Sequence, residues 1–84
     1  MRFRLVYTNR AAKDIRKLNK QVKERIGEAL QHFAEDPLVH SRRLINSDIG
    51  TYRYRIGDYR VVFDIEGSDI VLLRVGHRKD IYKR

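Results

Sequence analysis

Apolar and polar residues alternate at the start of the chain. The odd positions are apolar or aromatic: Met1, Phe3, Leu5 and Tyr7. A period of two is typical of a strand that buries one face. We therefore predict a first strand within residues 1–7.

The spacing of apolar residues then becomes helical. Thr8 and Asn9 offer side-chain oxygens that can cap the start of a helix. Apolar residues follow on one helical face at steps of four and three: Ala11, Ile15 and Leu18. Asn19 can adopt the left-handed conformation found at many helix ends, so this helix is predicted to break at residues 19–21.

A second helical stripe runs from Val22 to Phe33, with Ile26, Ala29 and Leu30 between them. This helix is predicted to end before Asp36-Pro37, because proline disfavours helix in the residue that precedes it. Together the two segments predict an antiparallel helical hairpin. Residues 37–50 show no clear period and are predicted to form a connecting loop.

Three β-rich segments fill most of the remaining chain. They span Thr51–Ile56, Tyr59–Ile65 and Ile70–Gly76, and short polar connections containing glycine join them. Such connections are typical of β-hairpins. The last residues, His77–Arg84, are predicted to form a short polar tail.

The order of elements is β-α-α-β-β-β. We predict a single domain over residues 1–84, since the chain has neither the length nor a linker for a second core. The predicted fold class is α+β. It has a mainly antiparallel four-stranded sheet, with the N-terminal helical hairpin on one face and a short C-terminal tail.

The stretch YRYRIGDYR is predicted to be a hairpin that turns at Gly57-Asp58. A two-residue turn there pairs Ile56 with Tyr59 and Arg55 with Arg60. One face of the hairpin then carries side chains for the helices to cover: Tyr52, Tyr54, Ile56, Tyr59, Val61, Phe63 and Ile65. The other face carries three arginines: Arg53, Arg55 and Arg60.

Like charges placed directly opposite each other destabilise a sheet, and no requirement of folding explains Arg55 opposite Arg60. One arginine on an exposed strand usually extends into water along its stem. Three on one patch favour an anion site, because guanidinium groups bind phosphate oxygens in bidentate geometry and strands hold them in place. The four-residue connection after Ile65 is expected to add Val75 and His77 to this face, unless a bulge shifts the register.

The net charge supports an anionic partner. Nineteen Lys and Arg residues against eleven Asp and Glu residues give +8 over 84 residues, and such a field attracts RNA, DNA or anionic lipid. Lipid is disfavoured, because the apolar faces of the helices are needed for the core. The basic face of the first helix, within residues 10–20, either lies in water or contacts RNA.

Cysteine is absent, which suits a reducing cytoplasm. The longest apolar run, residues 70–73, is too short to cross a bilayer. We therefore expect a cytoplasmic protein that does not enter a membrane. The three histidines, His32, His40 and His77, are too dispersed for a metal site, and we expect neither a metal ion nor another cofactor.

A second motif, GHRKDIY at residues 76–82, gathers an imidazole, a guanidinium and a phenol at a strand end, where functional groups often lie. Together with YRYRIGDYRVVF at residues 52–63, it makes the chain resemble the RelE/ParE toxin superfamily, and within it the RelE-like mRNA interferases. The resemblance spans nearly the whole chain. It implies a toxin of a type II toxin–antitoxin module, an endoribonuclease that blocks translation by cleaving mRNA, typically in the ribosomal A site.

The same resemblance implies the partners. These are a cognate RelB-like antitoxin, mRNA and the ribosome, without a membrane or a small-molecule cofactor. It also implies the chemistry, in which the ribose 2′-OH attacks the adjacent phosphate without a metal ion. The positions that match the basic residues of the family are those expected to bind RNA phosphate: Arg53, Arg55, Arg60 and Arg78. An aromatic hydroxyl is expected at Tyr82.

The chain departs from relatives that carry lysines where Arg53 and Arg55 stand. Arginine effectively cannot lose its proton, so these two residues can bind phosphate but are poor general bases. Proton transfer then falls to His77, since an imidazole has an unperturbed pKa of about 6.5, with Tyr82 assisting. The predicted catalytic residues are His77, Tyr82, Arg60 and Arg78. Whether His77 or Tyr82 is the general base stays open.

Two alternatives remain at this point. A ParE-like toxin shares the fold and inhibits DNA gyrase without nuclease activity, although that branch generally lacks the His-Arg…Tyr combination of residues 77–82. A catalytically inactive relative would bind RNA through the same arginines without cleaving it.

Overall fold

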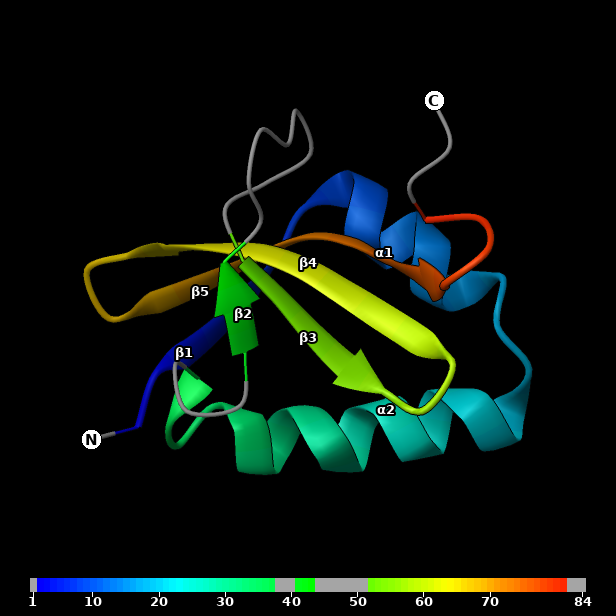
Figure 1. The fold of residues 1–84 in the computed structure, drawn as a ribbon, viewed down its shortest axis with the longest axis horizontal. Helices are drawn as coiled ribbons and strands as arrows, with labels where there is room; N and C mark the ends of the chain where they lie inside the picture. Colours follow the sequence, from blue (N-terminus) through cyan, green and yellow to red (C-terminus); the bar gives the residue numbers. More distant parts are fainter. Residues whose placement is uncertain (1, 38–40, 44–51, 82–84) are drawn as a thin grey trace.

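The computed structural model describes residues 2–37, 41–43 and 52–81. It confirms the predicted α+β architecture, with two helices and a mixed sheet (Figure 1). The elements follow one another in this order: β1 (Arg4–Tyr7), α1 (Asn9–Arg16), α2 (Lys20–Phe33), β2 (Ser41–Arg43), β3 (Tyr52–Ile56), β4 (Tyr59–Glu66) and β5 (Asp69–His77). Neither helix is long and apolar enough to span a membrane within these described ranges.

The sheet has the strand order β1-β5-β4-β3-β2. β1 runs parallel to β5, and all other neighbours are antiparallel. The short strand β2 lies inside the segment predicted to be a loop and pairs with β3 at the edge of the sheet. Three residues are too few to show an alternating pattern, so this strand could not be predicted from the sequence.

Both helices begin at a polar side chain that caps them. The Thr8 hydroxyl accepts a hydrogen bond from the Ala11 N–H at 3.2 Å and donates one to the Leu72 carbonyl at 2.7 Å. It therefore ties the start of α1 to β5. The Asn19 side chain accepts from the Val22 N–H at 2.9 Å. Asn19 has a φ of −71°, so it caps the start of α2 in an extended conformation. The predicted left-handed conformation is wrong, although the break lies where expected.

The core lies between the helices and one face of the sheet. In Figure 1, α2 runs past the turn between β3 and β4, and α1 lies beside β5. Phe33 of α2 stacks on Tyr54 of β3, with ring centroids 4.3 Å apart, and meets Phe63 of β4 edge-on at 4.9 Å. The predicted helix-facing side of the hairpin is confirmed, since its residues are in this core or pack against it.

The predicted register of the β3–β4 hairpin is also confirmed. Ile56 pairs with Tyr59 and Arg55 pairs with Arg60. The turn between them contains Gly57 at a φ of +59°, a left-handed conformation that costs glycine little. Alternation along the strands then places the three predicted arginines on the face away from the helices.

The register between β4 and β5 differs from the prediction because of a β-bulge. Phe63 pairs with Leu72, but Val62 pairs with Arg74, so Leu73 is an extra residue on β5. Because side chains alternate with a period of two, one extra residue moves every later side chain of β5 to the opposite face. Val75 and His77 therefore share the helix side with Val61 and Tyr59 instead of joining the arginines.

An aspartate of α1 completes the edge of the sheet beyond this bulge. The last pair between β1 and β5 is Tyr7 with Leu72. Further along β5, Asp14 Oδ2 accepts from the Val75 N–H at 3.0 Å and from Arg74 Nε at 2.8 Å. Only 11% of the Asp14 side chain and 19% of the Arg74 side chain is exposed. Asp14 thus supplies an acceptor where β1 no longer does, and it fixes the second half of β5 against α1.

We expect the Asp14→Ala substitution to lower the free energy of unfolding by about 2–4 kcal/mol, because it leaves a largely buried guanidinium and a backbone N–H without their acceptor. Urea denaturation of both proteins measures this difference. The matched control is Asp69→Ala, which removes a carboxylate paired with the exposed Arg4, and its loss should be clearly smaller. Equal losses for the two variants would show that Asp14 has no special role at the edge of the sheet.

Candidate nucleic-acid interface

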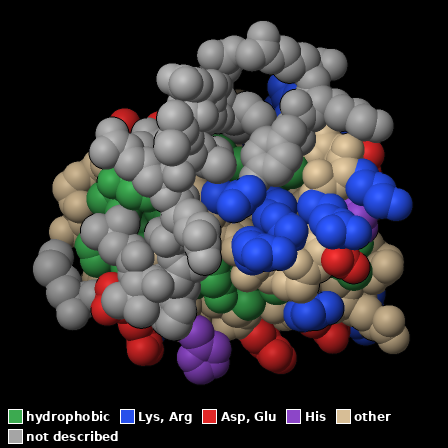
Figure 2. All heavy atoms as spheres, viewed as in Figure 1, with side chains coloured by type: hydrophobic (Ala, Val, Ile, Leu, Met, Phe, Trp, Pro, Cys, Tyr) green, Lys and Arg blue, Asp and Glu red, His purple; other side chains and the backbone are tan. Residues whose placement is uncertain are grey.

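Basic side chains gather on the face of the sheet that the helices leave open. Figure 2 shows Lys and Arg side chains together over β3 and β4. The three arginines of the hairpin differ in exposure: Arg55 is exposed, Arg53 is half-buried and Arg60 is only 6% exposed. The strands hold all three on one face, as predicted, but only Arg53 and Arg55 are accessible there. We call Arg53 and Arg55, with Arg60 beneath them, the arginine surface.

Arg60 is bonded to the turn of its own hairpin. Its Nη1 donates to the Gly57 carbonyl at 2.8 Å and to the Tyr59 carbonyl at 3.0 Å. The backbone N–H of Arg78 donates to the carbonyl between them, that of Asp58, at 2.8 Å. Three successive carbonyls of the turn therefore have donors. Arg60 therefore stabilises the folded hairpin, contrary to the interpretation from the sequence that folding does not require an arginine there.

These bonds also change the electrostatic balance of the Arg55–Arg60 pair. Carbonyl oxygens carry partial negative charge and lie against the Arg60 guanidinium, so they offset part of the repulsion between the two side chains. Arg55 has no ion pair with any residue that the structure describes. Its guanidinium remains available to an external anion.

Arg78 reaches the same turn from the end of β5. The chain after β5 folds back in a tight turn, in which the N–H groups of Asp80 and Ile81 both donate to the His77 carbonyl, at 2.9 and 3.0 Å. Ile81 is 1% exposed and closes this turn against the body of the protein. The Arg78 side chain is exposed, and its Nε lies 3.9 Å from Asp58 Oδ1. Arg60 and Arg78 thus contact the same turn, although they are separated in sequence.

His77 lies on the other face. Its ring meets Tyr59 edge-on, with ring centroids 5.5 Å apart, and its Nδ1 accepts from the Lys79 N–H at 3.1 Å. The expected place of this imidazole at the rim of the arginine surface is therefore wrong, for the reason given by the bulge. His77 lines a cavity of about 330 Å³ beside the end of α1, together with Leu18 and Ile81.

The remaining predicted residue, Tyr82, lies outside the described residues. Among the tyrosines that are described, Tyr54 packs in the core, where burial raises the pKa of its phenol. It stays neutral and belongs to the helix side. Within the described ranges, no three His, Cys, Asp or Glu side chains come together to hold a metal ion.

A basic residue of α2 also contacts the hairpin turn, and the sequence analysis missed it. A methyl group placed on Gly57 would lie 2.6 Å from Nη2 of Arg25, so the Arg25 guanidinium rests directly on this glycine. Arg25 is exposed on α2, as are the two lysines of the same helix, Lys20 and Lys23. No sequence signal distinguishes it from them, since only the fold brings α2 under the turn.

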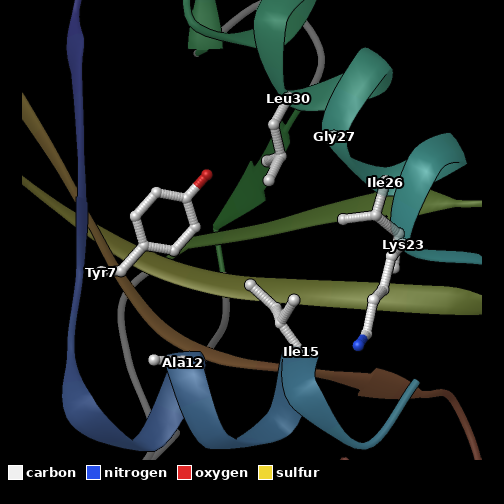
Figure 3. Close-up of a pocket in the computed structure, with 7 residues that line it drawn as sticks. All are labelled: Tyr7, Ala12, Ile15, Lys23, Ile26, Gly27 and Leu30. Carbon is white, nitrogen blue, oxygen red and sulfur yellow. The ribbon is translucent and has the colours of Figure 1, made fainter. Parts of the chain in front are cut away.

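A second cavity, of about 300 Å³, lies between the two helices and is lined mostly by apolar side chains. Figure 3 shows the Tyr7 ring extending from β1 into the space between α1 and α2, across from Leu30 and Ile15. Partial burial raises the pKa of the Tyr7 phenol. The cavity is on the helix side of the sheet and contributes nothing to the arginine surface.

Comparison with known proteins gives a consistent result. The family model described as "ParE toxin of type II toxin-antitoxin system, parDE" matches residues 5–82. Toxin RelG of Mycobacterium tuberculosis (strain ATCC 25618 / H37Rv) is 33% identical over 87 aligned residues, which cover all of both chains. Toxin RelE3 of Methanocaldococcus jannaschii is 48% identical over 31 residues, or 37% of this chain and 35% of RelE3.

Solved structures agree in fold over nearly the whole chain. A chain of the toxin–antitoxin complex RelBE2 from Mycobacterium tuberculosis has a TM-score of 0.84 at 28% identity, covering 93% of this chain and 100% of that one. A chain of the intact E. coli RelBE toxin–antitoxin complex has a TM-score of 0.72 at 23% identity, covering 89% and 95%. At that lower identity, the second likeness concerns the fold alone.

We expect the Arg60→Ala substitution to lower the free energy of unfolding by about 2–3 kcal/mol, because two turn carbonyls lose a charged donor and a buried side chain is removed. Arg55→Ala, on the same face and opposite in register, is the control and should change it by no more than about 0.5 kcal/mol. Chemical denaturation followed by circular dichroism measures both. A loss for Arg55→Ala as large as that for Arg60→Ala would contradict the structural role of Arg60.

Proposed function

Because this chain belongs to the RelE/ParE superfamily of toxins from type II toxin–antitoxin systems, we propose that it is an endoribonuclease that cleaves mRNA in the A site of translating ribosomes. The observation that carries this proposal is the arginine surface on the open face of β3 and β4. A rigid hairpin presents positive charge there, in a chain with a net charge of +8. Such a surface suits the phosphates of an RNA strand.

The residues take different parts in this proposal. Arg53 and Arg55 bind the scissile phosphate from the open face, and Arg78 approaches it from the turn after β5. Arg60 holds the hairpin turn through two carbonyls and adds its charge from beneath the surface. The two hydrogen bonds of Arg60 hold its guanidinium in place before RNA binds, and charge placed in advance favours electrostatic stabilisation of a transition state.

The proposed reaction uses the RNA itself as the nucleophile. The ribose 2′ oxygen loses its proton and forms a bond to the adjacent phosphorus, and the bond from phosphorus to the 5′ oxygen breaks. The 5′ oxygen takes up a proton and leaves as a hydroxyl, so the products are a 2′,3′-cyclic phosphate and a 5′-OH end. The arginines supply positive charge to the phosphate oxygens as negative charge builds on them, and no metal ion is needed for this part.

The two proton transfers are the part of the mechanism that the arginines cannot perform. The sequence-based hypothesis gave them to His77 with Tyr82 assisting. The His77 ring is on the helix side of β5, and its Nδ1 holds the turn that carries Arg78. We therefore assign His77 a positioning role and propose that Tyr82, the next residue after Ile81, acts as a phenolate that takes the 2′-OH proton and then delivers it to the leaving 5′ oxygen.

The expected partner in the cell is a cognate RelB-like antitoxin. Two solved structures with this fold are described as toxin–antitoxin complexes. We propose that the antitoxin of this chain covers the arginine surface with an acidic or amphipathic segment, since that surface attracts any flexible polyanion. Binding of the antitoxin and of RNA would then exclude each other.

A second candidate function follows from the family model, which is named for ParE. Under this alternative the chain inhibits DNA gyrase and cleaves no RNA. Mapping mRNA ends in a translating extract separates the two candidates. Cuts at A-site codons support the endoribonuclease, whereas intact mRNA together with trapped gyrase–DNA complexes supports the gyrase inhibitor. Intact mRNA without an effect on gyrase would leave an inactive RNA-binding relative.

For the arginine surface, we expect the double substitution Arg53→Ala and Arg55→Ala to lower the rate of mRNA cleavage at least about 100-fold, because it removes charge stabilisation at the phosphate. Primer extension on mRNA in a translating extract measures the rate. Arg2→Ala removes one exposed positive charge outside the proposed site, from a side chain that donates to Gln31, and should leave cleavage within about twofold. An undiminished rate in the double variant would refute the proposed site.

For His77, two substitutions separate positioning from proton transfer. In His77→Asn, the side-chain oxygen can still accept from the Lys79 N–H, as in an Asx-turn, whereas His77→Ala has no acceptor. We expect His77→Asn to keep cleavage within about threefold of the wild type and His77→Ala to lose about tenfold or more, since a 1 Å displacement can cost as much as 100-fold. Equal losses of about 100-fold or more in both variants would instead indicate proton transfer by the imidazole.

A further inference from the structure

The turn between β3 and β4 gathers more positive charge than the hairpin itself provides. We propose that Arg25 and Arg78 form a second phosphate-binding site at this turn, and that the Asp58 carboxylate, which lies beside Arg78, competes with RNA for the Arg78 side of this site. The ligand is the phosphodiester of single-stranded RNA next to the scissile phosphate, so Arg78 contacts both of these adjacent phosphates and Arg25 contacts the second one alone. This inference rests on the proposed function, because it assumes that RNA is the ligand.

The first observation is the close packing of Arg25 on the turn. A methyl group on Gly57 would lie 2.6 Å from Nη2, 3.1 Å from Cζ and 3.2 Å from Nη1 of Arg25. All three atoms belong to the guanidinium group, so the whole group lies against the glycine. Any side chain at position 57 would push it away. Gly57 thus gives the turn its left-handed conformation and leaves space for the arginine.

The second observation is that Arg25 has no anionic partner among the described residues. Glu28 lies three residues further along α2, at a spacing where ion pairs commonly form on a helix. The Arg25 side chain is exposed and rests on Gly57 instead. Its charge is therefore placed at the turn and is not cancelled there by an ion pair with Glu28.

The third observation is the imbalance of charge around the turn. Arg60 lies beneath it, bonded to two of its carbonyls, and Arg78 lies beside it. Asp58 is the acidic residue within this turn, and its carboxylate is 3.9 Å from Arg78 Nε. That pair is weak, because 55% of the Arg78 side chain and 70% of the Asp58 side chain is exposed to water.

A phosphate can therefore take the place of Asp58. It offers more acceptor oxygens than a carboxylate, and guanidinium groups bind it in bidentate geometry. The turn follows Arg55 by only two residues, or about 7 Å along the strand. Adjacent phosphates of an extended RNA strand can span this separation, so one strand can occupy the arginine surface and the turn together.

The experiment measures RNA binding apart from cleavage. A short, fluorescently labelled single-stranded RNA with 2′-O-methyl groups cannot undergo 2′-OH attack, and its anisotropy reports the dissociation constant over a range of salt concentrations. Arg25→Ala and Asp58→Asn are compared with the wild type. The charge-matched controls are Arg2→Ala and Asp36→Asn, which make the same changes of net charge at exposed positions outside the turn.

We expect Arg25→Ala to weaken binding and to lower the slope of log Kd against log salt by about 0.7, the value for one lost phosphate contact on a single strand. Asp58→Asn should strengthen binding about two- to fivefold at low salt, since it removes the competing carboxylate. Both effects should exceed those of the matched controls.

Two results would overturn the inference. One is an Arg25→Ala slope that equals the Arg2→Ala slope. The other is an Asp58→Asn affinity no higher than that of Asp36→Asn. Either result, combined with loss of RNA binding in the Arg53→Ala and Arg55→Ala double variant, leaves the proposed function standing. Undiminished RNA binding in that double variant would count against the proposed function itself, whatever Arg25 does.

Discussion

The arrangement of this molecule depends on how the turn between β3 and β4 satisfies its carbonyl groups. Gly57, Asp58 and Tyr59 each present a carbonyl, and the donors come from the Arg60 side chain and the Arg78 backbone. The hydrogen bonds of Arg60 keep a guanidinium buried under the open face of the sheet. The hydrogen bond from Arg78 brings the chain after β5 to the same place. One turn therefore holds together two segments of the chain, the β3–β4 hairpin and the residues after β5.

The second constraint is the register of β5, which the bulge and Asp14 determine together. Without the extra residue Leu73, Val75 and His77 would lie beside the arginines, and His77 would be the natural choice for proton transfer. With it, the imidazole is on the helix side, and its Nδ1 bonds the turn that carries Arg78. Asp14 holds this register by bonding the Val75 N–H and Arg74 beyond the end of β1. The role in proton transfer that the sequence suggested for His77 is therefore lost through a shift of one residue in the register of β5.

The sequence pattern predicted those features of the fold that depend on neighbouring residues alone. The alternation around Gly57-Asp58 predicted the hairpin register, and the aromatic residues on one of its faces predicted the core, because period and turn length decide both. The bulge was beyond prediction, since no composition marks a single extra residue in a strand. Arg25 was missed for a different reason: its importance comes from a contact between α2 and Gly57, which only the tertiary fold creates. The family resemblance predicted the class of protein, whereas the roles of its individual residues follow from these contacts.

Arginine suits position 60 of this hairpin better than lysine for a structural reason as well as a chemical one. A planar guanidinium with five N–H groups can bond two turn carbonyls from one nitrogen and still present other donors. An ammonium group has three donors and is more strongly hydrated, so burying it at 6% exposure would cost more. A guanidinium also stays charged at any pH that the protein meets, so the arginines cannot take part in proton transfer. A hairpin stabilised by buried arginine can therefore present a permanent positive surface, but it must obtain its acid and base from another part of the chain.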